Sequence, residues 1–299
     1  MNDDVYEKYK LAGEIAAKAR KYGSSLIKPG IGLLEIANKT EGKILEEGAG
    51  LAFPVNISIN EIAAHYSPVH DDKKIIHKGD VVKLDLGTHI DGYIADTAVT
   101  IEVKTNRYED MIKASSDALD SAINQIKPNI KLYEIGKTIQ EIINSYSYKP
   151  IDNLTGHSME KYNLHAGMSV PNIFDKTQNF ETKVDDVFAI EPFATDGAGH
   201  VKIGSGSNIF ICKQNLNTRF IRNKQLKFLF AKIRNRFKTL PFAQRWIEEM
   251  HSGSNSILRK LLFLRLIKQY PQLIDAGGGI VTQKEHTMIL NDDGCEVIT

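Results

Sequence analysis

The stretch "IKPGIGLLEI" spans Ile27–Ile36, and ninety-nine residues later the chain reads "IKPNIKLYEI" from Ile126 to Ile135, with seven of the ten positions identical. The patterns around the two copies follow one order, because each copy joins two helical patterns and is followed by a strand-like run and a pair of strands. This order predicts an internal duplication. Two related halves should be arranged about a pseudo-two-fold axis, with a functional site in the crevice between them.

The predicted elements correspond from half to half. Pro29 and Pro128 each end the first helical pattern of their half. Apolar residues at helical spacing predict helices over about 4–26, 33–47, 107–126 and 132–146. Strand-like alternation covers "LAFPVNISI", "DVVKLDLGTHIDGYIADTAVTI", "NLTGHSM", "DVFAIEPFAT" and "GGGIVTQKEHTMIL". The predicted fold class is therefore α+β, built twice from a helix-helix-strand-hairpin unit.

A basic segment interrupts the second hairpin. Residues 201–275 contain fifteen Lys and Arg against three acids, in a chain whose formal net charge is +1. Within this segment "NIFICK" predicts a short strand, and helical patterns lie near "NKQLKFLFAKIRNRF", "PFAQRWIEEM" and "SNSILRKLLFLRLIKQY". We predict a main domain formed by residues 1–199 and 276–299, and a small basic helical subdomain, residues 200–275, inserted in a hairpin loop, where insertions are tolerated.

The bulk features indicate a soluble intracellular protein. The composition is 42% hydrophobic and 25% charged, which is typical of a globular chain. The N-terminus "MNDDVYEKYK" does not resemble a secretory signal, and charges interrupt the most apolar stretch, so no membrane span is expected. Cys212 and Cys295 have neither metal-binding spacing nor a disulfide framework, which favours small buried side chains in a reducing compartment. The prediction is a cytoplasmic monomer.

The first hairpin carries a pair of acids. Asp91-Gly92 in "KLDLGTHIDGYIADTA" is a strong signal for a two-residue turn. Such a turn pairs Gly87 with Asp96 and Asp85 with Ala98, which places both carboxylates on one face, about 7–8 Å apart at the backbone. Among apolar neighbours two like charges are costly unless a cation holds them together. The alternative is an exposed hairpin with solvated acids.

The second half offers a matching pair. Glu191 lies within "DVFAIEPFAT" and Glu285 within "IVTQKEHTMIL". If these strands form the counterpart of the first hairpin, each half contributes two carboxylates near the axis. Four acids on an apolar sheet favour hard divalent cations, and His157 in "LTGHSM" would complete the set.

The motifs "AAHYSP", "DLGTHIDGYIADTA", "TGHSMEKYNLHAG", "AIEPFAT" and "QKEHTMIL" occur in this order, and together they resemble the methionine aminopeptidases. The resemblance covers nearly the whole chain, and the segment between the last two motifs is similar to the helical insertion of type II members. The long charged N-terminal extension of eukaryotic type II enzymes is absent, so the chain looks most like the compact archaeal form. The resemblance implies the pita-bread fold, with two pseudo-symmetric halves and a curved antiparallel sheet.

The resemblance also implies an enzyme, a metallo-exopeptidase. It would remove the N-terminal methionine from peptides and nascent proteins, preferably before a small second residue. Two divalent cations (Co, Mn or Fe, or also Zn) would share a water, lower its pKa and generate the attacking hydroxide. The family motifs place the metal ligands at Asp85, Asp96, His157, Glu191 and Glu285, with Asp96 and Glu285 bridging both ions.

Further residues match the family's substrate-contacting positions. Glu191 would act as the proton shuttle, His165 would stabilise the oxyanion, and His65 would hold the scissile amide. Phe53 and Leu164 match positions that line the methionine pocket.

Two rival functions and one partner are also considered. An Xaa-Pro aminopeptidase or prolidase shares the fold but carries an additional N-terminal domain, whereas only about fifty residues precede the first core strand here. A non-catalytic adaptor is disfavoured by the intact ligand set. The basic insert is either a solvated subdomain that shapes the cleft or a contact for ribosomal RNA, through clustered charges at Lys232, Arg234, Arg236 and Lys238.

Overall fold

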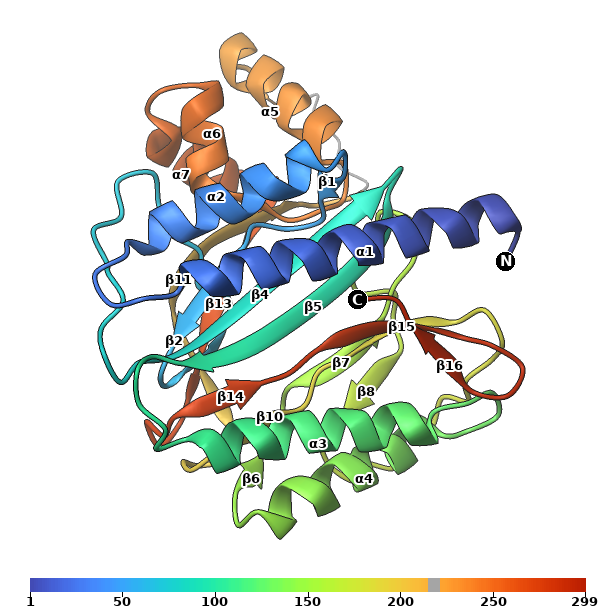
Figure 1. The fold of residues 1–299 in the computed structure, drawn as a ribbon. Coiled ribbons are helices and arrows are strands. Elements are labelled where there is room, and N and C mark those ends of the chain that lie inside the picture. Colours follow the sequence, from blue (N-terminus) through green and yellow to red (C-terminus); the bar gives the residue numbers. More distant parts are fainter. Residues whose placement is uncertain (215–220) are drawn as a thin grey trace.

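The computed structural model describes residues 1–214 and 221–299, and the order of its elements repeats once along the chain (Figure 1). Each half has two helices, three short strands and a long hairpin. The first half contains α1 (Asp3–Leu26), α2 (Leu33–Glu46), β1 (Gly50–Leu51), β2 (Asn56–Ile59), β3 (Ile62–Ala64), β4 (Val81–Ile90) and β5 (Tyr93–Glu102). The four helices predicted for the two halves are confirmed to within about two residues at each end.

The second half repeats this order with a divided hairpin. It contains α3 (Glu109–Gln125), α4 (Leu132–Ser145), β6 (Lys149–Pro150), β7 (Thr155–Ser158), β8 (Ser169–Pro171), β9 (Val187–Ile190), β10 (Phe193–Thr195), β14 (Val281–Gln283), β15 (His286–Leu290) and the C-terminal β16 (Cys295–Val297). The predicted pairing of the two distant hairpin strands is confirmed, since β15 pairs with β9 and β14 pairs with β10.

The repeated decapeptide spans the loop that joins the two helices of each half and the first turn of the second helix. Gly30 and Asn129, which differ between the copies, both have left-handed backbones with φ of 88° and 66°. Glycine adopts this conformation freely, and asparagine is among the few other residues that tolerate it. Each loop then makes one isolated bridge, Gly32 with Ile75 and Lys131 with Glu181. The two copies are therefore equivalent in backbone geometry as well as in sequence.

The helices of both halves lie on one face of a curved antiparallel sheet (Figure 1). Helix α1 packs on β4 and β5, whereas α3 and α4 pack on β8, β10 and β14. One apolar cluster is centred on the first half, with Ile36 and Leu84, and extends to Val187 of the second, whereas another, with Leu119 and Ile135, lies within the second half. The halves join where Ala98 of β5 and Glu285 exchange backbone hydrogen bonds of 3.4 and 3.1 Å.

The basic segment forms a ribbon with helices attached. Its elements are β11 (Val201–Cys212), α5 (Lys224–Phe237), β12 (Phe242–Ala243), α6 (Gln244–Met250), α7 (Ser254–Phe263) and β13 (Ile267–Asp275). Strand β11 pairs with β13, and β13 pairs in turn with β3 of the first half. The described residues of this segment, which excludes 215–220, share an apolar cluster that includes the stacked rings of Phe237, Phe242 and Trp246.

The prediction for the end of this segment was partly wrong. The helical pattern of "SNSILRKLLFLRLIKQY" ends at Phe263, because Arg265 has a left-handed backbone with φ of 55°. The residues that follow form β13, whose hydrogen bonds to β11 outweigh their helical spacing. The strand predicted at "NIFICK" also begins earlier, at Val201. Among the described residues, no helix combines the length and apolarity needed to cross a membrane.

Candidate active site

The β4–β5 hairpin has the predicted register. Asp91 and Gly92 form its turn, with φ of 52° and 93°, which matches the positive φ that a two-residue turn of this kind requires. Gly87 therefore pairs with Asp96, and the residue opposite Ala98 is Asp85. Both carboxylates project from the same face of the hairpin, as period-two alternation demands.

The second hairpin is divided at its own acids. Pro192 has no N–H for the ladder, so pairing stops after Ile190 and resumes at Phe193. Glu191 lies in this gap. Opposite, the backbone of Glu285 pairs with Ala98 of the first half instead of with β9. The gap therefore joins the two hairpins and brings the second pair of carboxylates beside the first.

His157 completes the cluster from β7, the strand predicted at "NLTGHSM". Its Nε2 lies 3.7 Å from Asp96 Oδ2 and 3.9 Å from Glu191 Oε1. One ligand atom each from Asp96, His157 and Glu285 all lie within 4.8 Å of one another. Gln283 Nε2, which the sequence analysis did not single out, donates to Glu191 Oε2 at 3.0 Å and fixes that side chain.

The charges of this cluster are not balanced by the protein. Among the described residues, no Lys or Arg nitrogen lies within 4.0 Å of the four carboxylates. Burial raises the pKa of Asp85 to about 7. Burial, together with neighbouring carboxylates, raises the pKa of the other three well above their usual range: Asp96, Glu191 and Glu285. A site of this kind favours a cation, because ionised acids at this density repel one another.

The donor set fits divalent cations. Asp85 Oδ1 and Asp96 Oδ1 are buried and have no hydrogen-bond partner among the described residues. A buried oxygen without a partner is costly, and coordination to a cation would satisfy it. Burial lowers the pKa of His157 well below its usual range, which keeps its imidazole neutral, the form that binds metals.

All nine residues singled out from the sequence line one cavity, which encloses about 500 Å³ of empty space including its mouth. The five candidate metal ligands are part of its lining, and His165 lies beside His157 with ring centroids 4.5 Å apart. The remaining three line the same cavity: Phe53, His65 and Leu164.

His65 contacts the basic insert. Its Nδ1 lies 3.3 Å from the carbonyl oxygen of Pro271, and its ring meets Tyr270 edge to face at 5.3 Å. Burial lowers the pKa of His65 to about 4, so the ring is neutral near pH 7. Since the Pro271 carbonyl can only accept, Nδ1 carries the proton and Nε2 is left as an acceptor.

Sequence reasoning missed the wall that the insert supplies. The cavity is also lined by Asn56 and Ala64 of the first half and by Ile209, Pro241 and Tyr270 of the insert. Tyr270 was not predicted to line the cavity because its segment was predicted as the end of a helix. The available signal was Pro271, since the residue before a proline is biased away from helix.

Comparison with known proteins places this site in a family context. A model of metallopeptidase family M24 matches residues 7–212. A methionine aminopeptidase of Methanocaldococcus jannaschii is 47% identical over 299 residues, with all of both chains covered. A methionine aminopeptidase of Methanothermobacter thermautotrophicus is 42% identical over 304 aligned positions, covering 99% of each chain.

Solved structures share the architecture. A thermophilic Arx1 matches all of this chain and 91% of its own length with a TM-score of 0.87 at 19% identity. A methionine aminopeptidase of Thermotoga maritima matches all of this chain and 98% of its own length with a TM-score of 0.73 at 20% identity. At these identities the similarity concerns the fold alone, and it confirms the predicted two-half pita-bread architecture.

Proposed function

The chain belongs to metallopeptidase family M24, and from this premise we propose that it is a methionine aminopeptidase, which removes the N-terminal methionine from peptides and nascent proteins, preferably before a small second residue. The observation that carries the proposal is the similarity over the full length to archaeal relatives of that name. The cavity supports it, because an acidic cluster lies directly beside an apolar pocket. The rival functions, an Xaa-Pro peptidase and an adaptor, are not favoured by these relatives.

The metal ligands in this proposal are Asp85, Asp96, His157, Glu191 and Glu285. The family resemblance assigns the bridging of both ions to Asp96 and Glu285, which lie with His157 in one group of donor atoms within 4.8 Å of one another. Four carboxylates with one imidazole suit Mn, Fe or Co, and also accommodate Zn. Divalent cations held there would supply Lewis acidity, which lowers the pKa of water and polarises a carbonyl group.

The remaining chemistry falls to the side chains of the cavity. Glu191 has the raised pKa expected of a group that takes a proton and then donates it to the leaving amine. His65 offers Nε2 as an acceptor for the N–H of the scissile amide. His165 is neutral, since burial lowers its pKa, and its ring N–H can donate to the oxyanion that develops on the carbonyl oxygen.

Substrate selection follows from the two ends of the cavity. Phe53, Leu164 and Tyr270 give an apolar wall that accepts a flexible thioether side chain. The free α-amine of a chain terminus, once deprotonated, could bind a cation held by the carboxylates, which an internal amide nitrogen cannot do. A residue that carries an apolar side chain and a free amine at one carbon therefore suits both ends of the cavity.

We expect metal-restored cleavage of a methionine peptide. Protein treated with a chelator and then resupplied separately with Mn, Co, Fe or Zn should release the first residue from Met-Ala-Ser and leave Ala-Pro-Ser intact. Release is measured by chromatography of the products. Cleavage of the proline peptide alone would establish the Xaa-Pro activity instead, and cleavage of neither peptide with any metal would reject both enzymes.

We also propose that the insert, residues 200–275, is a distinct subdomain whose basic helix contacts ribosomal RNA. Helix α5 buries an apolar stripe that includes Leu229 and Ile233. Its opposite side and C-terminal end expose four cations: Lys232, Arg234, Arg236 and Lys238. Such a cluster is an electrostatic footprint for phosphates. We also propose that the protein is cytoplasmic and monomeric, as predicted from the sequence.

Replacing these four cations by glutamine should weaken co-sedimentation with ribosomes and reduce its dependence on salt, because fewer counterions are released on binding. The measurement compares the pelleted fraction at low and moderate salt. A matched control replaces four exposed lysines of the catalytic part by glutamine: Lys21, Lys28, Lys78 and Lys176. If both variants lose the same fraction of co-sedimentation with ribosomes, the four cations of the insert make no specific contact.

A further inference from the structure

The backbone of His65 is in an unfavourable conformation. Its φ is 65°, in the left-handed region that glycine and asparagine tolerate and other residues rarely adopt. The residue follows the last residue of β3 and its ring enters the catalytic cavity. A conformation of this kind persists only where surrounding contacts hold it, and such positions cluster at functional sites.

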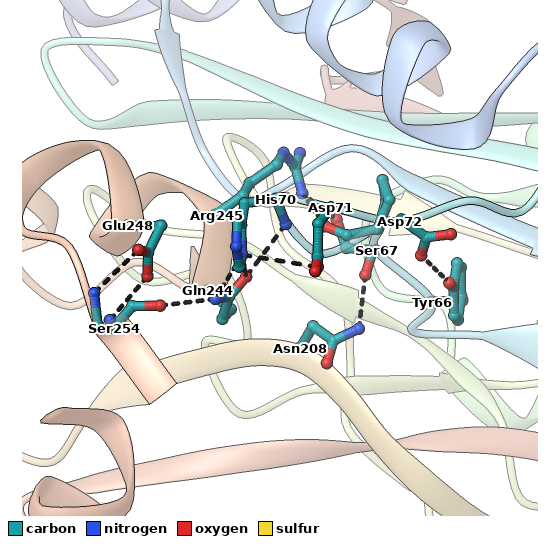
Figure 2. Close-up of polar contacts among 12 residues, drawn as sticks. Tyr66, Ser67, His70, Asp71, Asp72, Asn208, Gln244, Arg245, Glu248 and Ser254 are labelled. Carbon is teal, nitrogen blue, oxygen red and sulfur yellow. Dashed lines mark hydrogen bonds and ion pairs between the residues drawn. The ribbon is translucent and has the colours of Figure 1, made fainter. Parts of the chain in front are cut away.

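Ser67, two residues further on, supplies the fixed point. It is fully buried, and its hydroxyl, N–H and carbonyl are all hydrogen-bonded; Figure 2 shows the bond to Asn208. Its hydroxyl donates to the Val55 carbonyl at 2.8 Å, and its N–H donates to the Ser207 carbonyl at 3.3 Å. Its carbonyl accepts from Asn208 Nδ2 at 3.0 Å. Strand β11 of the insert therefore fixes the chain by hydrogen bonds two residues after His65.

Helix α6 of the insert also contacts Ser67, through Arg245. Arg245 is 2% exposed, and its NH1 donates to Ser67 Oγ at 2.8 Å and to the Pro68 carbonyl at 3.0 Å. Its NH2 pairs with the buried carboxylate of Glu41 on α2. Glu41 also accepts from Trp246 Nε1 at 2.9 Å and from the Val55 N–H at 3.0 Å. Arg245 is therefore fixed by α2 while it holds Ser67.

Strand β13 fixes the ring itself. The Pro271 carbonyl accepts from Nδ1 of His65, and Tyr270 packs against the ring edge. Three elements of the insert thus contact this short segment: β13 contacts His65, and β11 and α6 contact Ser67. The first half supplies the histidine, and the insert sets its position.

We propose that Ser67 and Arg245 are positioning residues that hold His65 in its left-handed conformation and aim Nε2 at the scissile amide. The basic insert is then a working part of the catalytic site. The proposal rests on the proposed aminopeptidase function for its kinetic consequences, whereas its structural consequence is independent of any activity.

The test is Ser67→Ala with Ser254→Ala as the matched control. Ser254 is also a fully buried serine of this region, and its hydroxyl accepts from Gln244, the neighbour of Arg245, at 2.6 Å (Figure 2). Ser67→Ala leaves Arg245 bonded to Pro68 and Glu41, so no buried charge loses all its partners. We expect Ser67→Ala to lower kcat for the methionine peptide by about 10-fold with unchanged metal content. Ser254→Ala should stay within about twofold of the parent, the level of a change outside the site.

A double-mutant cycle shows whether the loss passes through His65. His65→Asn tolerates the left-handed backbone. In that background Ser67→Ala should change kcat by less than about twofold, because the interaction it perturbs is already gone. A full loss that persists in the His65→Asn background, or equal losses from Ser67→Ala and Ser254→Ala, would overturn the proposal.

A spectroscopic readout separates this proposal from the proposed function. The imidazole NMR signals of His65 in the metal-free protein, assigned with His65→Asn, should shift in Ser67→Ala and stay in place in Ser254→Ala. If the parent cleaves no methionine peptide, the proposed function fails and these signals alone decide the positioning role. If Ser67→Ala does not fold, Asn208→Gly, which keeps the positive φ of 65° at that position, is judged by the same criteria.

Discussion

Glu285→Gln is expected to lower kcat/KM for a methionine peptide by about 10³-fold, equivalent to about 4 kcal/mol of transition-state stabilisation. Glu285 lies in one group of donor atoms with Asp96 and His157. A neutral amide removes the charge of one proposed bridging ligand, so metal retention should fall together with turnover. Both are measured on the same preparation, by peptide cleavage and by elemental content after dialysis. Full activity would show that Glu285 does not bridge.

The same substitution should stabilise the metal-free protein. Burial and, in addition, the neighbouring Asp96, Glu191 and Asp85 raise the pKa of Glu285, so its ionisation costs free energy in the folded state, a cost that a neutral glutamine does not carry. An increase of about 0.5–2 kcal/mol in the free energy of unfolding is expected near pH 7.5 in the presence of a chelator. Glu46→Gln is the matched control, since this exposed helix residue should change neither quantity.

The second large effect is on the pH dependence of stability. Carboxyl groups with raised pKa bind protons more tightly in the folded state than in the unfolded state, so the metal-free protein should lose stability as pH rises through their folded pKa values. Each group still protonated in the folded state then lowers the free energy of unfolding by about 1.4 kcal/mol per pH unit. The contributing groups are Asp85, Asp96, Glu191 and Glu285.

The diagnostic range lies above pH 6.5. Below it, histidines with lowered pKa act in the opposite direction, because they bind protons more readily in the unfolded state: His65, His89, His157, His165 and His286. Above it the histidine contribution fades as these residues become neutral in the unfolded state too, and the four carboxyl groups outweigh Lys83, whose pKa burial lowers to about 7 and which acts in the opposite direction.

Urea unfolding of the chelated protein between pH 6.5 and 8.5 should therefore show falling stability. A divalent metal in excess should reverse the trend, because it competes with protons for the same oxygens and binds only the folded site. At a free concentration of 100 times Kd the metal should add about 2.7 kcal/mol. Stability that rises with pH in the chelated protein would contradict the raised pKa values.

Local sequence signals were sufficient for the parts of the site that depend on short-range geometry. Asp91-Gly92 is a turn whose length fixes which faces the flanking residues occupy, so the positions of Asp85 and Asp96 followed from counting along the strands. The decapeptide repeat likewise located the helices of both halves, because a proline and a left-handed residue stop each helix.

The features that sequence reasoning missed depend on pairing between residues far apart in the chain. Residues 267–270 continue the apolar spacing of α7, and their pairing with β11 makes them part of a strand instead. The position of Tyr270 in the cavity lining was therefore not predicted. The division of the second hairpin has a local cause in Pro192, but its consequence, the bridge from Glu285 to Ala98, joins residues nearly two hundred positions apart. No short segment of the sequence indicates either contact.

The bridge between Ala98 and Glu285 also bears on the origin of the molecule. The proposed bridging carboxylates, Asp96 and Glu285, come from opposite halves, so one repeat alone carries half a metal centre. A single-repeat ancestor could have completed such a centre only as a symmetric homodimer, with identical acids from each copy meeting on the two-fold axis. In this account, divergence after fusion would explain why the first half contributes two aspartates to the cavity and the second contributes two glutamates and the histidine.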